Sequence, residues 1–320
     1  MSPSKQQQIF ITGGSGFLGS VVIELAVAEG FLVHALSRSK ESDEKLKQLG
    51  AFPVRGDLTS HHILASESKA ADIIFSLATA YVLGRGTYAD ALPTDNAVID
   101  TIASAIVDTN KPLIITNGTL VAQGDGSGNE THEDAPIESG PLGVRAQNEQ
   151  HALSKAKDGV RIMSIRVAAY TYGRGGSGIK QFMGMASHMG SMFTIEGGKN
   201  YVTATHVEDT AKLYLLAAQK GKAGDIFNAG AATDITAKEI YEAIAAAVGV
   251  QVVDLSYEEA VSKFGESFAW FIRADNRASG DKARKQLGWE PKGKGVLEEL
   301  RTGSYVEVAR ALKKNWESIP

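Results

Sequence analysis

Short apolar runs alternate with helix-length stretches from Ile9 to Val167. Several of these runs are apolar at consecutive positions, which is typical of strands that are covered on both faces of a parallel sheet. Strands that alternate with helices in this way predict a doubly wound, Rossmann-type α/β fold with a parallel sheet. The expected strands are 9–12, 31–37, 52–55, 73–78, 113–117 and 161–167, and the expected helices between them are 17–29, 41–49, 60–70, 95–109 and 144–157.

The alternation breaks down in two places. Residues 123–143 are rich in glycine and polar side chains, and we expect a long mobile loop there. Beyond Tyr172 the chain is glycine-rich and then mixed, with helices expected at 206–219, 236–248 and 297–313. The pattern therefore predicts two domains. The dinucleotide-binding domain takes residues 1–175 and 203–230, and a smaller C-terminal substrate domain takes residues 176–202 and 231–320.

The most informative stretch follows the first expected strand. Gly14, Gly16 and Gly19 fit G-x-G-x-x-G, and Thr12 with Gly13 extends the match to T-G-x-x-G-x-x-G. Glycines let the backbone approach a pyrophosphate without a Cβ clash, and the following helix offers its N-terminal N–H groups. We expect a bulky residue at Gly14 to block binding while the fold stays intact; a tight turn without a ligand is the alternative. The expected nicotinamide cofactor contacts are Thr12, Gly13, Gly14, Ser15, Gly16, Phe17, Leu18 and Gly19.

The end of the second expected strand distinguishes NADP from NAD. An acidic residue there binds the ribose 2′-hydroxyl of NAD, whereas an arginine meets the 2′-phosphate of NADP. The strand ends in Ser37 and Arg38, and both side chains can donate to a phosphate, so NADP is the expected cofactor. Glu41 and Asp43 lie close enough in the sequence to keep NAD open, with Arg38 then a solvated side chain.

Another polar position follows the third expected strand, where Asp57 precedes Leu58. Asp57 can accept a hydrogen bond from the adenine amino group of a dinucleotide. It also lies ahead of an expected helix whose N-cap is Thr59 or Ser60. Both interpretations can hold together.

Composition narrows the class of function. Of the 320 residues, 43% are hydrophobic and 22% are charged, which is ordinary for a globular protein with a sizeable core. The formal net charge is −4 and the basic residues are spread along the chain, so nucleic acid is not an expected partner. The absence of cysteine excludes disulfides and thiolate metal sites.

Residues 1–8 are polar where a signal peptide would be apolar, and no apolar run approaches the ~20 residues that cross a bilayer. We therefore expect a cytoplasmic protein that acts on a small molecule and does not bind a membrane. The sequence leaves the oligomeric state open, a homodimer included.

Motifs that are spread over most of the chain resemble one family. They are Thr12–Gly19, Asp57–Leu58, Leu77–Ala78, Thr116–Thr119, Arg166–Gly173, His206–Asp209 and Leu287–Pro291. Together they resemble the short-chain dehydrogenase/reductase superfamily in its extended or atypical form. Within it, the chain is most similar to an atypical fungal and bacterial subgroup that includes NAD(P)H-dependent aldehyde reductases. The resemblance implies further cofactor contacts from Leu58, Leu77, Ala78, Thr79, Asn117, Arg145, Val167 and Ala168.

The resemblance fails at the residues that carry the usual chemistry. Typical members use a serine and a Tyr-x-x-x-Lys pair, in which the tyrosine passes a proton to or from the carbonyl oxygen. Here Pro141 stands at the tyrosine position and Arg145 at the lysine position, whereas the atypical subgroup often has His-x-x-x-Arg. The serine position falls on Gly118 or Thr119. The resemblance thus implies cofactor binding and leaves the proton donor unassigned.

Four side chains are candidates for the missing catalytic groups. Arg145 can hold the nicotinamide ribose or polarise a carbonyl, or else it pairs with Glu149 on the helix surface. Thr119 can hydrogen-bond the substrate oxygen, or else it caps a turn. Tyr81 and Tyr172 can each donate a phenolic proton, or else they line a pocket or pack in the core.

Three other clusters have structural interpretations. His132–Asp134 lies in the expected loop with a spacing that suits no metal, so we expect it to be solvated and expect no metal site. His206 and Asp209 open an expected helix, whose dipole the carboxylate favours. The aromatic cluster Phe268–Phe271 is expected to pack in the core of the smaller domain, with a substrate pocket as the alternative.

The leading functional hypothesis is NADP-dependent reduction of a carbonyl or imine carbon by hydride transfer. An imine that is already protonated needs no tyrosine donor, which suits a chain with Pro141. A second hypothesis is a non-redox enzyme on the same scaffold, such as a dehydratase, epimerase or isomerase. A third is a non-catalytic sensor of NAD(P) that regulates a partner protein.

Overall fold

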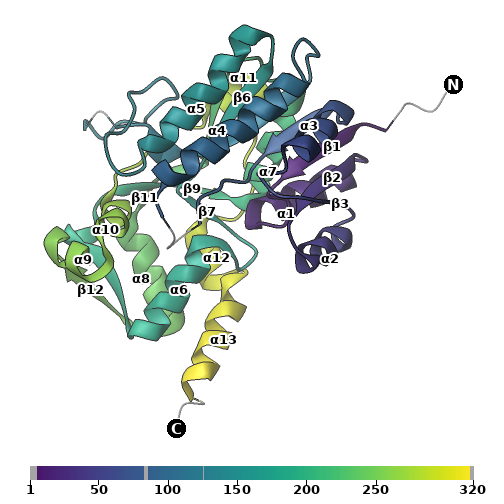
Figure 1. Cartoon of the computed structure of the whole chain (residues 1–320). Helices are drawn as coiled ribbons and strands as arrows, with labels where there is room; N and C mark the ends of the chain where they lie inside the picture. The colour runs from purple at the N-terminus through teal and green to yellow at the C-terminus, as the bar shows by residue number, and fades with distance from the viewer. Residues whose placement is uncertain (1–5, 83–85, 125, 318–320) are drawn as a thin grey trace.

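The computed structural model describes residues 6–82, 86–124 and 126–317, so part of the polar stretch 1–8 lies outside the described residues. Within these ranges, the centre of the fold is a seven-stranded sheet in the order β10-β6-β5-β4-β1-β2-β3. Figure 1 shows β1, β2 and β3 side by side at one end of it. Every strand pairing in it is parallel, which confirms the predicted doubly wound Rossmann architecture. Its strands are β1 (Gln8–Thr12), β2 (Leu32–Ser37), β3 (Phe52–Arg55), β4 (Ile73–Ser76), β5 (Pro112–Gly118), β6 (Arg161–Val167) and β10 (Ile226–Ala229).

The consecutive apolar positions of β1 serve two separate cores. Ile9 and Ile11 pack into the core on one face of the sheet, and Phe10 packs into the core on the other face. Side chains alternate across a strand, so a strand that is covered on both faces must be apolar at every position. This is the physical origin of the pattern in the sequence.

Helices cover both faces of the sheet. On one face α7 packs between α1 and α11, and on the other face α3, α4 and α5 pack side by side. These helices and the edge helix α2 are α1 (Phe17–Ala28), α2 (Lys40–Gln48), α3 (His61–Ala70), α4 (Tyr88–Ala105), α5 (Val144–Ser154), α7 (Val207–Lys220) and α11 (Asp281–Leu287). These helices thus form the two hydrophobic cores on either side of the Rossmann sheet.

Helix α4 begins earlier than the expected start near residue 95. Thr87 accepts a hydrogen bond from the Asp90 amide, and the Asp90 carboxylate accepts one from the Thr87 amide. This capping box satisfies N–H groups at the helix start, and Pro93 then lies inside the helix. The earlier start makes Tyr88 the first residue of α4.

A second core lies beside the Rossmann sheet, in the lower part of Figure 1. It contains a three-stranded sheet in the order β11-β9-β7 and a two-stranded sheet of β12 and β8 within the described ranges. Helix α11 lies in the stretch expected to belong to the smaller domain, but its Ala283 and Leu287 pack in the core of the Rossmann sheet. The strands are β7 (Tyr170–Tyr172), β8 (Ser191–Ile195), β9 (Tyr201–His206), β11 (Ala232–Thr236) and β12 (Gln251–Leu255). The helices are α6 (Ser177–Met189), α8 (Ala237–Val248), α9 (Tyr257–Phe264), α10 (Glu266–Arg273), α12 (Val296–Thr302) and α13 (Tyr305–Glu317).

The expected helix 297–313 is two helices, α12 and α13, separated at Gly303. Glu299 accepts hydrogen bonds from the amide and hydroxyl of Ser304 at this break. In the part of the chain that the structure describes, every helix is too short or too polar to cross a membrane.

Candidate functional site

The glycine-rich loop after β1 is shaped by backbone contacts that admit no side chain. Gly13 has φ of +75°, and a Cβ there would lie 2.9 Å from the Ala78 amide nitrogen. A Cβ on Gly19 would collide with the Gly13 carbonyl oxygen. The loop can therefore lie directly against the end of β4 and the first turn of α1 only with glycine at these positions.

The N-terminus of α1 is suited to an anion. Gly16 is the N-cap residue, no side chain caps the helix, and the first turn contains no acidic residue. The first N–H groups of the helix thus lack a side-chain partner, and the helix dipole favours negative charge. Gly16 is exposed, and a Cβ there would have only the Gly13 carbonyl oxygen, at 3.1 Å, within 4 Å. This cradle fits the pyrophosphate of a dinucleotide.

The structure argues against the expectation that a bulky residue at Gly14 leaves the fold intact. Gly14 is buried, and a Cβ on it would lie 2.7 Å from Ile23 Cδ1 and 3.2 Å from Ala35 Cβ. The side of Gly14 that would carry a side chain therefore faces the core, not the place where a phosphate would lie.

The polar groups after β2 differ from one another in availability. Arg38 is exposed, and no ion pair joins it to a described carboxylate. Ser37 is buried and its hydroxyl donates to the Ser39 carbonyl at 3.2 Å, so its donation to a phosphate stays a prediction that requires this hydrogen bond to change. Asp43 pairs with Arg55. The Glu41 carboxylate accepts hydrogen bonds from the Glu41 amide and from the Ser39 side chain, which hold the pKa of Glu41 below its ordinary value.

Asp57 adopts the helix-start role that was expected of it. Its carboxylate accepts hydrogen bonds from the Thr59 amide at 2.8 Å, the Thr59 hydroxyl at 2.7 Å and the Ser60 hydroxyl at 3.1 Å. These bonds hold the pKa of Asp57 below its ordinary value. Ser60 is the N-cap residue of α3, and Leu58 packs at the border of the core beneath α3 and α4. The adenine contact of Asp57 stays a prediction.

Several expected cofactor contacts have buried side chains that hold neighbouring backbone segments in place. The Thr12 hydroxyl is buried and accepts a hydrogen bond from the Ala78 amide at 3.2 Å, which fixes the end of β4 beside β1. Asn117 is buried and its amide group donates to the Arg145 carbonyl at 3.2 Å, which fixes the start of α5 beside β5. Ala168, which directly follows β6, is also buried. Their expected contribution to cofactor binding is therefore through the backbone.

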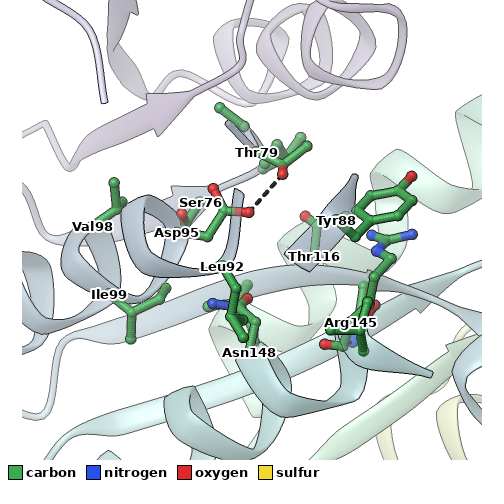
Figure 2. A pocket seen from close by; sticks show the side chains of 15 residues that line it. Ser76, Thr79, Tyr88, Leu92, Asp95, Val98, Ile99, Thr116, Arg145 and Asn148 are labelled. Atoms are coloured by element: carbon green, nitrogen blue, oxygen red, sulfur yellow. Dashed lines mark hydrogen bonds between the residues drawn. The ribbon is translucent and has the colours of Figure 1, made fainter. Parts of the chain in front are cut away.

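A pocket opens where β4 and β5 end, between α4 and α5 (Figure 2). Ligands bind a doubly wound sheet at the edge formed by the carboxyl ends of its strands, and the switch in strand order lies next to this pocket, between β1 and β4. Its polar side chains are Ser76, Thr79, Tyr88, Asp95, Thr116, Asn117, Arg145 and Asn148, and its walls include Leu77, Ala78, Leu92, Val98, Ile99, Ile115 and Val144.

Arg145 lies in this pocket and does not pair with Glu149. Its guanidinium carbon is 5.0 Å from the centre of the Tyr88 ring. Figure 2 shows the two side chains next to each other. Glu149 is turned inward and pairs with buried Arg166 at 2.6 Å, and Ser164 donates to it at 2.6 Å. The surface-pair alternative is therefore wrong. Among the described residues no carboxylate forms an ion pair with Arg145.

The three other catalytic candidates differ in position. Thr119 is fully buried and its hydroxyl donates to the Asn276 side chain at 2.7 Å, outside the pocket. Tyr172 is buried and donates to the Lys294 carbonyl at 2.8 Å, beside the smaller core. Tyr81 stacks on Tyr88 with ring centres 3.9 Å apart, so it borders the pocket from the side of β4. Only Arg145 of the four lines the pocket itself.

Tyr88 is a pocket residue that sequence analysis missed. Burial raises the pKa of Tyr88 above its ordinary value, and the nearby charge of Arg145 opposes that rise. The signal that could have found it was the sequence Thr87-x-x-Asp90, which predicts a helix start ahead of Pro93. With α4 starting there, its first residue faces the pocket.

The remaining clusters are largely structural. Glu133 of the 123–143 loop is half-buried, because its carboxylate accepts from the Asn228 amide at 2.9 Å and its carbonyl accepts from Arg166 at 3.1 Å; the expectation of a solvated side chain is wrong there. Asp209 is buried and holds the Lys292 and Gly293 amides at 3.0 and 2.7 Å.

The aromatic cluster of α10 packs as expected. Phe268 and Phe271 pack against the smaller core, which confirms the core-packing interpretation of the 268–271 cluster. Trp270 lies against Gly140 of the 123–143 loop.

Comparison with known proteins gives one family. Residues 9–230 match the NAD dependent epimerase/dehydratase family. An uncharacterized protein of Saccharomyces cerevisiae is 31% identical over 297 residues, which cover 92% of this chain and 98% of that protein. The sterol-4-alpha-carboxylate 3-dehydrogenase, decarboxylating, of Dictyostelium discoideum is 28% identical over 234 residues, covering 69% of this chain and 70% of that protein. The Thermus thermophilus UDP-glucose 4-epimerase in complex with NAD shares the fold, with a TM-score of 0.72 and 18% identity over 95% of this chain and 99% of that one.

Proposed function

This chain belongs to the NAD dependent epimerase/dehydratase family of extended short-chain dehydrogenases/reductases, and from that premise we propose that it reduces a carbonyl or imine of a small organic molecule with NADPH. Members of this family are NAD(P)-dependent enzymes, so an oxidoreductase of this class is the coarse assignment. The direction of the reaction, the substrate class and the preference for NADP are parts of the proposal.

The observation that carries the proposal is the placement of Arg145. Its guanidinium lies in the pocket at the ends of β4 and β5, against Tyr88, with no carboxylate paired to it among the described residues. A fixed positive charge in a partly buried pocket stabilises negative charge that develops on a substrate oxygen, and it costs no reorganisation during the reaction. The relative named as a dehydrogenase supports chemistry at a carbon–oxygen bond.

Two parts of the site would bind the cofactor and the substrate. The N-terminus of α1 would hold the pyrophosphate, and the pocket at the ends of β4 and β5 would take the reacting end of the cofactor and the substrate. When bound, a reduced nicotinamide supplies the hydride. Arg145 would then orient the electrophile and stabilise its oxygen, and the apolar walls of Leu92 and Ile99 would exclude water.

The preference for NADP rests on the charge after β2. Arg38 is exposed and unpaired with any described carboxylate, while Asp43 is occupied by Arg55. Lys45 donates to the Ser15 carbonyl at 2.5 Å, which adds a second cation beside the glycine-rich loop. Two cations beside this loop favour a 2′-phosphate over a free 2′-hydroxyl.

The test is a substrate screen with the purified protein. Aldehydes, ketones and cyclic imines are each added with NADPH or NADH, and loss of the reduced nicotinamide absorbance at ~340 nm is followed. We expect oxidation of NADPH that depends on the added compound and is slower with NADH.

Two other outcomes would contradict the proposal in different ways. Product formation without net oxidation of the cofactor would identify a non-redox enzyme of the same family. Tight cofactor binding without turnover of any compound, across the whole screen, would favour a sensor.

A further inference from the structure

We propose that Tyr88 is the proton donor of this site and replaces in space the tyrosine whose sequence position is taken by Pro141. This inference rests on the proposed reduction and adds a catalytic residue to it. The family motif does not point to Tyr88, because Tyr88 comes from α4, whereas the family tyrosine precedes the residue that is Arg145 on α5.

Two contacts hold the Tyr88 ring in the pocket. The ring stacks on Tyr81 with centres 3.9 Å apart and planes at 26°, and the Arg145 guanidinium lies 5.0 Å from its centre. Stacking and cation–π contacts each favour one orientation of the ring. Figure 2 shows the phenol and the guanidinium together on the side of the pocket that faces away from Val98 and Ile99. Tyr88 is therefore a fixed phenol beside a fixed cation.

A hydrogen-bond network from α4 fixes the stacking partner. The Asp95 carboxylate accepts from the Thr79 hydroxyl at 2.6 Å and from the Ala80 amide at 2.7 Å. The Tyr81 amide in turn donates to the Thr79 hydroxyl oxygen at 3.2 Å. The segment after β4 is thus tied to the same helix that begins with Tyr88. Asp95 and Thr79 act through Tyr81 and are positioning residues.

The charges around Tyr88 suit a group that starts neutral and becomes an anion for a short time. Burial raises the pKa of Tyr88, and the phenol of Tyr81 and the carboxylate of Asp95 raise it further, so the proton is held at neutral pH. Among the described residues, Arg145 is the cation that faces Tyr88, and it lowers that pKa. A phenolate formed during turnover is therefore stabilised by the guanidinium, as a lysine stabilises it in typical members of the superfamily.

The step balances in protons and electrons. Addition of a hydride to the carbonyl carbon moves the π-electron pair onto the oxygen. Tyr88 then gives up its hydroxyl proton, the substrate oxygen gains it, and an alcohol forms. The tyrosinate recovers a proton from water before the next turnover. An iminium substrate carries its own proton, and its reduction does not need this step.

The first experiment compares Tyr88→Phe with wild type on a carbonyl and on an iminium substrate. Loss of a general acid costs about 10²-fold or more in kcat, so we expect that loss on the carbonyl. On the iminium we expect a loss below about tenfold, because only positioning is affected. The control is Tyr201→Phe, an exposed tyrosine on β9 outside the pocket, for which we expect wild-type kcat on both substrates.

The second experiment needs no turnover. The pKa of Tyr88 is measured by NMR of ring-labelled tyrosine in wild type and in Arg145→Met, with Tyr88→Phe to assign the signal. Removing the guanidinium removes the charge that lowers the pKa of Tyr88, so we expect that pKa to rise. Cofactor affinity of Tyr88→Phe is measured by calorimetry in parallel and is expected to stay near wild type.

The outcomes separate the two proposals. Wild type that reduces nothing in the screen overturns the proposed function and the donor role with it. Wild-type turnover that Tyr88→Phe retains on the carbonyl overturns the donor role alone, as does an equal loss on carbonyl and iminium. If Tyr81→Phe loses the carbonyl activity and Tyr88→Phe does not, the donor is the neighbouring phenol. A Tyr88 pKa that does not respond to Arg145→Met also overturns the inference.

Discussion

Valine at Gly16 should remove cofactor binding and leave the fold in place. Gly16 has φ of −74° and ψ of 177°, a backbone conformation that valine adopts without strain. A Cβ there would meet one atom within 4 Å, the Gly13 carbonyl oxygen at 3.1 Å. The rest of the side chain would project into the exposed space at the N-terminus of α1, where the pyrophosphate is proposed to lie.

The expected loss follows from the bonds that the valine would block. A hydrogen bond from a backbone N–H to a charged phosphate contributes about 1.5–3 kcal/mol. Exclusion of two such bonds, about 3 kcal/mol at the lower bound, raises Kd about 100-fold or more. The N-cap is less favourable with valine than with glycine, and this should cost at most about 1 kcal/mol of unfolding free energy.

Gly14→Val is the matched control, because it puts the same side chain two residues away on the opposite side of the loop. Its Cβ would lie 2.7 Å from Ile23 Cδ1 in a packed core. Overpacking of this kind costs about 1–3 kcal/mol, so Gly14→Val should lose more stability than Gly16→Val.

Calorimetric titration with NADPH gives the affinities, and denaturant unfolding without cofactor gives the stabilities. Wild-type affinity in Gly16→Val would refute the placement of the pyrophosphate. A Gly14→Val protein as stable as wild type would refute the conclusion that Gly14 faces a tightly packed core, since the core would then accommodate the extra atoms.

Four other changes test separate parts of the structure. Arg38→Ala should remove most of the preference for NADPH over NADH, a change of roughly ten- to a hundredfold in relative Kd by calorimetry, and an unchanged ratio would show that Arg38 is solvated in the complex. Arg145→Ala should lose about 10²-fold or more in kcat/KM, with partial recovery in Arg145→Lys, and full activity of the alanine variant would remove Arg145 from the site. Glu149→Ala leaves Arg166 buried without its partner and should cost about 3–5 kcal/mol in denaturant unfolding, whereas a loss of a few tenths would contradict the buried pair. Burial raises the pKa of Glu133 above its ordinary 4.5, so the folded state binds the proton more tightly and stability falls as pH rises through that window. Glu133→Gln should therefore gain stability over wild type as pH rises above about 4.5, and a constant difference across pH would contradict the shift.

The order of strands and helices in the Rossmann domain could be predicted because its signals are local. Consecutive apolar positions follow from burial on both faces of a parallel sheet, as Ile9 and Phe10 show by packing into different cores. The glycine-rich loop could also be predicted, because its geometry requires glycine at fixed positions. A side chain on Gly13 would meet the residue Ala78 after β4, and one on Gly19 would meet the Gly13 carbonyl. The smaller domain could not be assigned in the same detail, because its strands do not alternate regularly with helices: β8 is followed by β9, and β10 by β11, with no α-helix between them.

What each side chain of the site faces was decided only by the tertiary structure. Sequence spacing allows Glu149 to pair with Arg145, but the burial of α5 against β6 turns Glu149 to Arg166 and leaves Arg145 in the pocket. Spacing also cannot tell that Gly14 faces the core while Gly16 faces outward, because that depends on where Ile23 packs. The approach of Tyr88 to Arg145 requires α4 and α5 to lie side by side on one face of the sheet, and strand order places them there. A local pattern specifies an element and the faces it buries, whereas the neighbours of a side chain depend on elements that are distant in the chain.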